Sequence, residues 1–301
     1  MRILILGSGS ATPTVTRNPT AQILEVSGRF FLIDCGETTQ HSLLRKKIPL
    51  LKINHIFISH LHGDHWLGLP GLISSMHLGG RKAPLTLFCP VGMEVLLQTI
   101  FHYSETQLQF EIEYHFHHPT EKNLIWEDDG MEIFSFPLTH KIPCNGFLFQ
   151  EKPKLRNLRR EAIEVYNIPV ESMMEIKSGK DWKHPDGRII PNALLTKDPK
   201  TSSSYAFCSD TAFNPDLPSF FPQVTVLYHE ATFTEELGDR AAKTLHSTAI
   251  QAGKIAQMAK AKNLLIGHFS SRYKDLNPFL VEVKSNFENS TLVFDGFIFD
   301  F

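Results

Sequence analysis

A short stretch rich in histidine, FISHLHGDHWLG at residues 57–68, constrains this chain more than any other feature. His60, His62, Asp64 and His65 lie within six positions, directly after an apolar run, residues 55–58, that is typical of a buried strand. In an extended segment His60 and His62 point the same way. Imidazole and carboxylate groups at a strand end suit zinc, manganese or iron. A histidine-rich surface turn is the other interpretation, but the stretch does not lie in a polar low-complexity run.

Composition narrows the class of protein. The chain has 301 residues, of which 42% are hydrophobic and 21% charged, as expected for one large α/β domain or two smaller ones. The net charge of -2 excludes a global basic field, so any contact with nucleic acid must come from a local patch. The four cysteines are scattered and suggest buried thiols in a reducing compartment. With no signal peptide and no apolar run of membrane-spanning length, we expect a cytoplasmic protein without a membrane partner.

Other predicted strands also end in residues that bind metals. A histidine or aspartate follows the apolar segments at 131–138, 205–208 and 264–267. Polar residues at the carboxyl ends of strands in an α/β fold converge at one edge. The candidate metal ligands are therefore His60, His62, Asp64, His65, His140, Asp210 and His268. One zinc with an open position needs only three protein ligands, so seven fit two metals, with Asp210 as the predicted bridge.

Asp34 ends a further predicted strand, residues 29–34. It could cap the helix expected at residues 38–47, or it could orient a metal-bound histidine. The pattern leaves both roles open.

Three more histidines, His115, His117 and His118, accompany an alternating segment at residues 111–116. We expect them to lie on a solvated strand and not to bind metal.

Residues 151–200 interrupt the alternation of strands and helices, and we interpret them as an insertion. Its basic run has no acidic residue between positions 152 and 160 and comprises Lys152, Lys154, Arg156, Arg159 and Arg160. Charge runs are usually solvated surface, so a surface excursion and an RNA-binding arm both remain open on this pattern.

The order of these motifs resembles the metallo-β-lactamase superfamily, and further residues are similar to its ribonuclease Z family of tRNA 3′-processing endonucleases. Residues 13–18 resemble that family's Pro-x-Lys-x-Arg-Asn loop, residues 229–232 read His-Glu-Ala-Thr, residues 246–248 read His-Ser-Thr, and residues 268–273 resemble its last metal motif. The resemblance covers essentially the whole chain. It implies an α/β fold, the four-layer αββα metallo-β-lactamase sandwich, as a single domain over residues 1–301, with residues 151–200 as an inserted, protruding, flexible RNA-binding arm.

The resemblance also implies roles for individual residues. His60, His62 and His140 would hold one zinc ion, Asp64, His65 and His268 the other, and Asp210 would bridge them. Asp64 would accept the proton of the nucleophilic water. Glu230 would orient His246, which would protonate the departing 3′-oxygen or stabilise the phosphoryl charge. The residues expected to contact RNA are Arg17, Asn18, Arg272 and the five basic residues Lys152, Lys154, Arg156, Arg159 and Arg160.

The implied activity is removal of the 3′ trailer from precursor tRNA by a homodimer with two zinc ions per subunit. The tRNA would keep a 3′-hydroxyl and the trailer a 5′-phosphate. The alternatives are a small-molecule phosphodiesterase or other hydrolase on the same fold, and an RNA-binding protein without activity, which the complete ligand set disfavours. The chain departs from the family pattern at Val15, where the loop has lysine, at Ser209, where glycine usually precedes the bridging aspartate, and in the arm, which lacks a Gly-Pro tip.

Overall fold

The computed structural model describes residues 1–118 and 120–301. It divides into two compact units. The core unit comprises residues 1–126, 133–149 and 203–301, and the arm unit comprises residues 127–132 and 150–202. Among the described residues, no helix is both long and apolar enough to cross a membrane.

The first sheet of the core unit has seven strands in the order β20-β1-β3-β4-β5-β6-β7. Its strands are β20 (Ile298–Asp300), β1 (Arg2–Gly7), β3 (Ala21–Val26), β4 (Arg29–Cys35), β5 (Ile53–Phe57), β6 (Leu85–Cys89) and β7 (Ile112–Phe116). From β4 to β7 the strands are parallel, so each connection must cross over the sheet. The crossovers carry α1 (Thr39–Arg45), α2 (Leu69–Leu78) and α3 (Met93–Tyr103).

The second sheet also has seven strands, in the order β19-β17-β16-β15-β10-β9-β8. They are β19 (Ser290–Leu292), β17 (Asn263–Gly267), β16 (Val226–Glu230), β15 (Ser204–Cys208), β10 (Asn145–Glu151), β9 (Met131–Pro137) and β8 (Asn123–Glu127). The strands β15, β16, β17 and β19 are parallel. The helices of this half are α7 (Gly238–Thr244), α8 (Ala249–Met258) and α9 (Asn277–Lys284).

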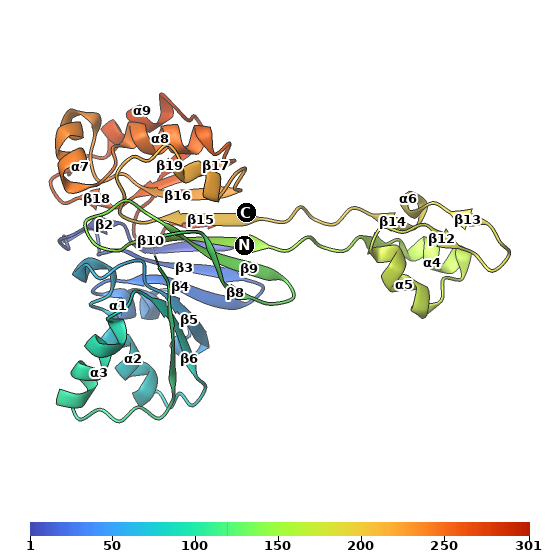
Figure 1. Ribbon diagram of the computed structural model, residues 1–301, viewed down its shortest axis with the longest axis horizontal. Helices are drawn as coiled ribbons and strands as arrows, with labels where there is room; N and C mark the ends of the chain where they lie inside the picture. The colour runs from blue at the N-terminus through green and yellow to red at the C-terminus, as the bar shows by residue number, and fades with distance from the viewer. Residues whose placement is uncertain (119) are drawn as a thin grey trace. The chain divides into compact units, whose positions relative to one another are not determined.

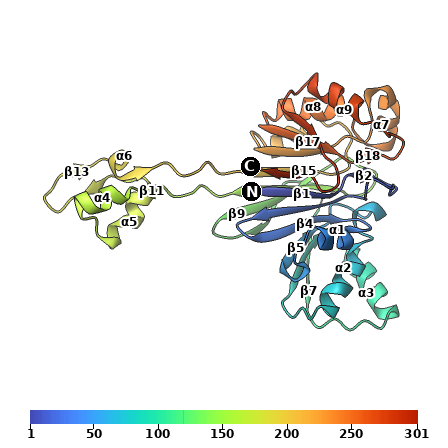
Figure 2. The same ribbon diagram turned by 180° about the vertical axis from the view of Figure 1, so that it is seen from behind.

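The two sheets lie face to face, with helices α1–α3 outside the first sheet and α7–α9 outside the second (Figure 1). The predicted four-layer α/β sandwich is therefore confirmed. The view from behind shows the same layers and places the two termini side by side (Figure 2), where the Met1 amino group donates to the Phe301 carbonyl at 2.8 Å.

Aromatic side chains fill the space between the sheets. Phe57 of β5 stacks on Phe88 with ring centroids 4.6 Å apart and meets Phe147 and Phe149 of the second sheet edge-on. Its neighbour Ile56 points the other way and joins the apolar cluster beneath α2. Strands buried on both faces in this way need continuous apolar runs, which is why residues 55–58 predict a strand correctly.

A short parallel pair of strands closes the edge near the chain's polar motifs. β2 (Gly9–Ser10) pairs with β18 (Phe269–Ser270), directly after His268. This pairing joins the first loop of the chain, residues 8–18, to the last predicted metal motif.

The arm unit has a small apolar core of its own. The hairpin strands β12 (Trp182–Lys183) and β13 (Ile189–Ile190), and the pair β11 (Asn157–Leu158) with β14 (Thr196–Lys197), accompany the short helices α4 (Arg160–Tyr166), α5 (Val170–Lys177) and α6 (Asn192–Leu195). Its buried residues are Ala162, Ile168, Ile176, Trp182, Ile190 and Leu195.

Candidate metal centre

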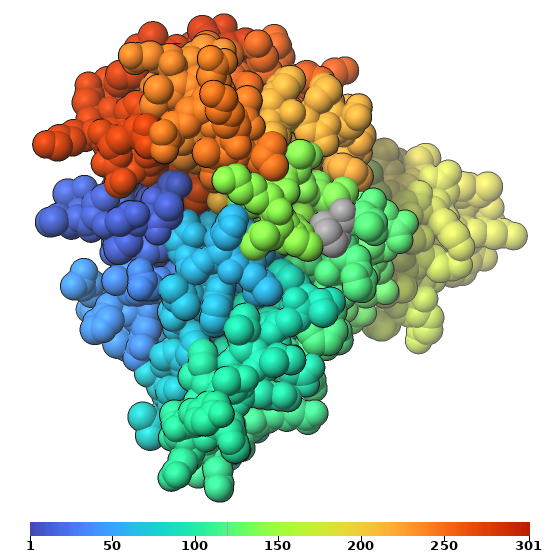
Figure 3. Space-filling model, turned by 60° about the vertical axis from the view of Figure 1, so that its left-hand side comes forward, coloured from blue at the N-terminus to red at the C-terminus, as the bar shows by residue number. Residues whose placement is uncertain are grey.

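Loops at the ends of strands bring the seven predicted ligands into two adjoining groups. His60, His62, His140 and Asp210 form one, and Asp64, His65 and His268 form the other; within each group the ligand atoms lie no more than 4.8 Å apart. Figure 3 shows four segments that border one another on one face of the surface. They are the first loop in dark blue, the segment near residue 65 in light blue, the segment near residue 140 in light green and the C-terminal half in orange.

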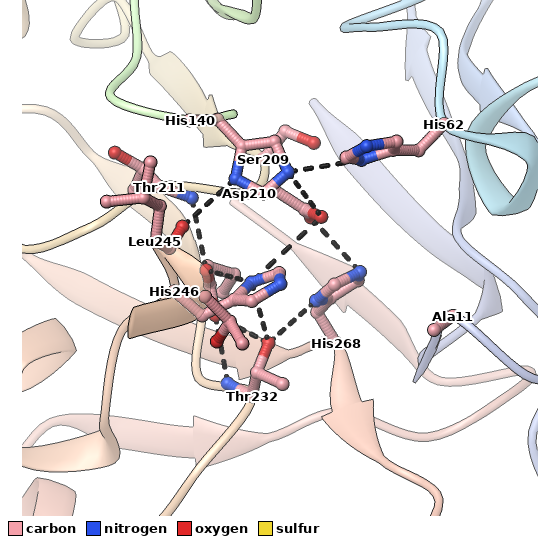
Figure 4. A network of polar contacts seen from close by, with 12 residues as sticks. Ala11, His62, His140, Ser209, Asp210, Thr211, Thr232, Leu245, His246 and His268 are labelled. Atoms are coloured by element: carbon pink, nitrogen blue, oxygen red, sulfur yellow. Dashed lines mark hydrogen bonds and ion pairs between the residues drawn. The ribbon is translucent and has the colours of Figure 1, made fainter. Parts of the chain in front are cut away.

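Asp210 lies between the two groups. Its Oδ2 is 3.7 Å from Nε2 of both His60 and His140, and its Oδ1 is 3.4 Å from Nε2 of His65 and 3.0 Å from Nε2 of His268. Figure 4 shows rings from several strand ends gathered around this carboxylate. A bridging carboxylate needs one oxygen toward each metal, and the two oxygens of Asp210 are directed in that way.

The donor atoms fit a bound metal. Nε2 of His65, Nε2 of His268 and Oδ1 of Asp210 are buried and have no hydrogen-bond partner among the described residues. A buried polar atom left without a partner costs about 1–3 kcal/mol, so such atoms are rarely left unused. Imidazole nitrogens and carboxylate oxygens at this spacing are ligands for a divalent metal ion, and the cluster is a divalent metal site.

In four of the five histidine ligands, the second ring nitrogen is held from outside the cluster, which fixes the ring orientation. Three of the partners are an adjacent hydroxyl, a backbone carbonyl and a threonine hydroxyl, at 2.9–3.0 Å. The pairs are His60 with Ser59, His140 with Leu245 and His268 with Thr232.

Asp34 holds the fourth ring. Its Oδ2 lies 2.7 Å from Nδ1 of His65, and its carboxylate accepts hydrogen bonds from the amide and the hydroxyl of Ser59 at 2.8 and 2.9 Å. Helix α1 receives no side-chain cap from the described residues. Of the two roles left open by the sequence, the geometry therefore shows the histidine contact. Ser209 joins this network, with its hydroxyl 3.0 Å from that of Ser59.

Glu230 and His246 form a buried pair beside the cluster. The Glu230 carboxylate, at the end of β16, accepts hydrogen bonds from the amides of Thr211 and Thr232 and lies 2.8 Å from Nδ1 of His246. Burial disfavours a charged His246, but the Glu230 carboxylate outweighs it and raises the pKa of His246 to about 9. The ring is therefore protonated at neutral pH, and with 15% of its side chain exposed it can reach a substrate.

The first loop contacts the cluster through its backbone. The Ala11 amide donates to Oδ2 of Asp64 at 2.7 Å, the oxygen that also lies 3.4 Å from Nε2 of His65. Asp295 holds the base of the loop by accepting from the Ser8 amide at 3.0 Å. Val15, where the family pattern has lysine, is fully exposed.

The three core residues predicted to contact RNA lie in or beside this loop and already have protein partners. Arg17 donates to the carbonyls of Ser270 and Tyr273 at 3.2 and 2.8 Å. The side chain of Asn18 donates to the Leu6 carbonyl at 3.2 Å. Arg272 lies over the Phe233 ring, 5.3 Å from its centroid, and donates to the Ser270 hydroxyl at 3.0 Å. Their RNA contacts remain predictions.

Each basic residue of the run in the arm unit contacts an acidic side chain or a carbonyl that lies outside the run. Lys152 pairs with Glu127 at 2.7 Å and Lys154 with Glu151 at 2.8 Å. The remaining pairs are Arg156 with Asp198, Arg159 with the Thr196 carbonyl and Arg160 with Glu164. The structure brings none of the seven metal ligands into this unit, and the role of the run in RNA binding stays a prediction.

Sequence reasoning missed some of the groups that orient the ligands. The Leu245 carbonyl carries no signal in the sequence, because any residue offers a carbonyl. Thr232 could have been found, since it belongs to the His-Glu-Ala-Thr motif. The prediction that His117 lies on a solvated strand is wrong: its side chain is buried, with a residue exposure of 5%.

Comparison with known proteins places this site in a family. The family model described as Anti-Pycsar protein Apyc1 matches residues 1–155, and over that half the chain falls within the family that this model describes. A metallo-beta-lactamase fold protein from Bacillus subtilis covers 99% of the chain with a TM-score of 0.68 at 15% identity, which shows the shared fold.

Relatives with higher identity cover nearly the whole chain. A ribonuclease Z of Parabacteroides distasonis is 44% identical over 294 residues, 98% of this chain and 97% of that protein. A ribonuclease Z of Bacteroides fragilis is 41% identical and covers 96% of this chain and 95% of its own. The crystal structure of human tRNase Z, short form, matches with a TM-score of 0.75 and 25% identity over 100% of this chain and 99% of that one. The chain therefore belongs to the ribonuclease Z family of metal-dependent endoribonucleases on the metallo-β-lactamase fold.

Proposed function

We propose that this protein is a zinc-dependent endoribonuclease that removes the 3′ trailer from precursor tRNA, leaving a 3′-hydroxyl on the tRNA and a 5′-phosphate on the trailer. The observation that carries the proposal is Asp210 between two groups of ligand atoms, beside the buried pair of Glu230 and His246. The names of the relatives and of the human structure support the same reaction.

In the proposed site, His60, His62 and His140 would hold one zinc ion, Asp64, His65 and His268 would hold the other, and Asp210 would serve both. Zinc ions bound there would lower the pKa of the attacking water and neutralise charge on the phosphate. The chain's own side chains then have to place the reacting atoms and move protons.

Asp64 is proposed to accept the proton of the attacking water. Burial would raise its pKa, but the neighbouring rings of His65 and His268 hold the pKa well below its usual range. The carboxylate is therefore ionised at neutral pH. The Ala11 amide holds one of its oxygens in place and so fixes its direction.

His246 is proposed to serve the leaving group. Its raised pKa keeps a proton on the ring at neutral pH, and the contact between Glu230 and Nδ1 leaves Nε2 to face a substrate. A proton donated from Nε2 to the departing 3′-oxygen would prevent charge from building on that oxygen, and general acid catalysis of this kind contributes about 10²–10⁴-fold.

Substrate binding is proposed to involve the arm, residues 151–200, as a flexible RNA-binding segment. It carries eleven Lys and Arg residues against eight Asp and Glu, while the whole chain has a net charge of -2. The proposal includes a cytoplasmic homodimer, in which the arm of one subunit binds tRNA at the site of the other, and RNA contacts by Arg17, Asn18 and Arg272.

The experiment is cleavage of a precursor tRNA with a short 3′ trailer, combined with metal analysis of the protein. We expect about two zinc ions per chain, loss of cleavage on chelation and recovery on adding zinc, with the end groups stated above. Cleavage that leaves a 3′-phosphate, or hydrolysis restricted to small phosphodiesters, would contradict the proposal and favour the small-molecule hydrolase.

A further inference from the structure

His117 is a buried histidine that the proposed mechanism does not use. It follows β7, its residue exposure is 5%, and its ring meets Phe147 edge-on at 5.5 Å. It belongs to none of the groups of potential metal ligands among the described residues. A buried polar side chain with no part in the chemistry has to be explained by what it touches.

The two ring nitrogens of His117 touch one segment that precedes a metal ligand and one that follows a metal ligand. Nε2 lies 2.8 Å from the carbonyl of Ile58, two residues before His60, and Nδ1 lies 2.9 Å from the side-chain oxygen of Asn145, at the start of β10. Burial lowers the pKa of His117 to about 4, although the contacts with Ile58 and Asn145 oppose this shift. A carbonyl can only accept, so Nε2 donates to Ile58. The Asn145 side-chain oxygen faces Nδ1, and the Asn145 amide nitrogen donates to the His118 carbonyl at 3.2 Å.

Asn145 continues the connection from both of its ends. Its backbone amide donates to the Ser59 carbonyl at 3.1 Å, next to His60. It also follows Cys144, whose carbonyl accepts from Leu138 and so closes the loop that carries His140. The loop that carries His60 belongs to the first sheet, and the loop that carries His140 belongs to the second.

We propose that His117 is a positioning residue that ties the loop of His60 to the loop of His140 and thereby sets the metal affinity of the group formed by His60, His62 and His140. The inference rests on the proposed function only in taking these three residues as ligands of one zinc ion. Groups that orient metal ligands typically change metal affinity about 10–100-fold when they are removed. His117 touches neither metal nor substrate, because both of its ring nitrogens are used within the protein.

The test is a zinc titration of the metal-free full-length protein against a competing chelator, with no RNA present. His117→Ala should weaken the binding of one zinc ion at least about tenfold and leave the other within about threefold. His115→Ala is the matched control, because His115 is an exposed histidine two residues earlier, whose ring lies 5.1 Å from that of Phe88; it should leave both affinities unchanged. His117→Gln, which keeps an N–H donor for the Ile58 carbonyl, should recover most of the loss.

Two further variants make the result decisive. In an Asp64→Ala background, where the second group lacks a ligand, His117→Ala should still weaken the remaining ion, which assigns the effect to the group of His60. Asn145→Ala removes the other end of the bridge and should reproduce the loss, and it decides the matter if His117→Ala does not fold.

Unchanged zinc affinities in His117→Ala, or in Asn145→Ala, together with a lower melting temperature would overturn the proposal and leave His117 as a residue of the core only. The proposed function can fail separately: a wild-type protein that binds two zinc ions but does not cleave precursor tRNA would contradict the function, while the affinities would still decide the role of His117.

Discussion

The metal centre of the core unit and the basic run of the arm unit differ in how their polar groups are satisfied. In the metal centre, Nε2 of His65, Nε2 of His268 and Oδ1 of Asp210 are buried and have no hydrogen-bond partner among the described residues. In the arm, the charged groups of the run are partnered, and Arg160 keeps 90% of its side chain exposed. The buried atoms of the metal centre need a bound metal ion to satisfy them, whereas the basic residues of the arm are already satisfied and can bind a phosphate only by exchanging partners.

Energetics explain why the two regions should respond differently to substitution. An exposed ion pair contributes about 0–1 kcal/mol, so a phosphate can replace Glu164 as the partner of Arg160 at little cost. In the metal centre, by contrast, each side chain supplies a ligand atom, so metal binding depends on every member of the set. We therefore expect effects on catalysis to decrease from the metal centre to the arm.

Replacing Asp210 should have the largest effect on catalysis. Asp210→Ala removes the carboxylate that faces both groups, so we expect kcat to fall about a thousandfold or more on precursor tRNA and on a small phosphodiester alike. Asp216→Ala, which changes an exposed aspartate six residues further on, is the control and should retain activity. A small loss of kcat in Asp210→Ala would contradict the bridging role of Asp210.

Glu230→Gln should have the next largest effect, a loss in kcat of about a hundredfold. In the wild type, Glu230 raises the pKa of His246 to about 9, so the proton donor is lost only as the pH rises through that value. Without the carboxylate, the pKa should return toward its ordinary value of 6.5, and the alkaline limb of the pH–rate profile should move to lower pH. If the alkaline limb of the pH–rate profile stays at the same pH in Glu230→Gln, His246 is not the proton donor.

Arg160→Glu should have a small effect that depends on salt. Reversing one exposed arm cation should raise the KM for precursor tRNA about threefold at low ionic strength, with kcat unchanged, and the difference should shrink as salt screens the charge. Lys284→Glu is the matched control, because Lys284 also pairs with a glutamate four residues on, Glu288, but in the core unit. If both reversals raise KM equally, the arm has no special role for its charge.

Arg81→Met should leave catalysis unchanged although it alters a buried charge. The Arg81 guanidinium is buried and donates to the carbonyls of Leu51, Ile53 and Ala83, so its hydrogen bonds are satisfied inside the protein. We expect the free energy of unfolding to fall by about 3 kcal/mol, because several carbonyls lose their donor, while kcat stays within about twofold. Denaturant unfolding measures the free energy, and initial rates measure kcat. A large loss of kcat would show that Arg81 is needed for catalysis and not only for stability.

Much of the fold and of the metal centre could be predicted because the decisive residues are close in sequence or follow apolar strands. His60, His62, Asp64 and His65 share one turn, and strand ends supplied the others. The partners of the rings could be predicted only in part. The carbonyl that holds His140 belongs to Leu245, more than a hundred residues away, and no side-chain pattern marks it.

The surroundings of the basic run and of His117 could not be predicted from sequence neighbours, for the same physical reason. A basic run looks unpaired when only neighbours in sequence are counted, but the partners of Lys152 and Arg156 are Glu127 and Asp198, which the fold brings in from other segments. His117 looked solvated because the alternation of its strand is polar, and it is buried because segments of both sheets cover it.

The most direct test of this division between chemistry in the core unit and substrate choice in the arm is to replace residues 153–201 by a short Gly-Ser linker. The replacement is feasible because β10 and β15, which flank the segment, are neighbours in the second sheet. The initial rates on precursor tRNA and on a small phosphodiester are then compared with those of the wild type. We expect cleavage of precursor tRNA to fall about a hundredfold while hydrolysis of the small phosphodiester stays within about threefold. An equal loss on both substrates, or no loss on either, would contradict the account.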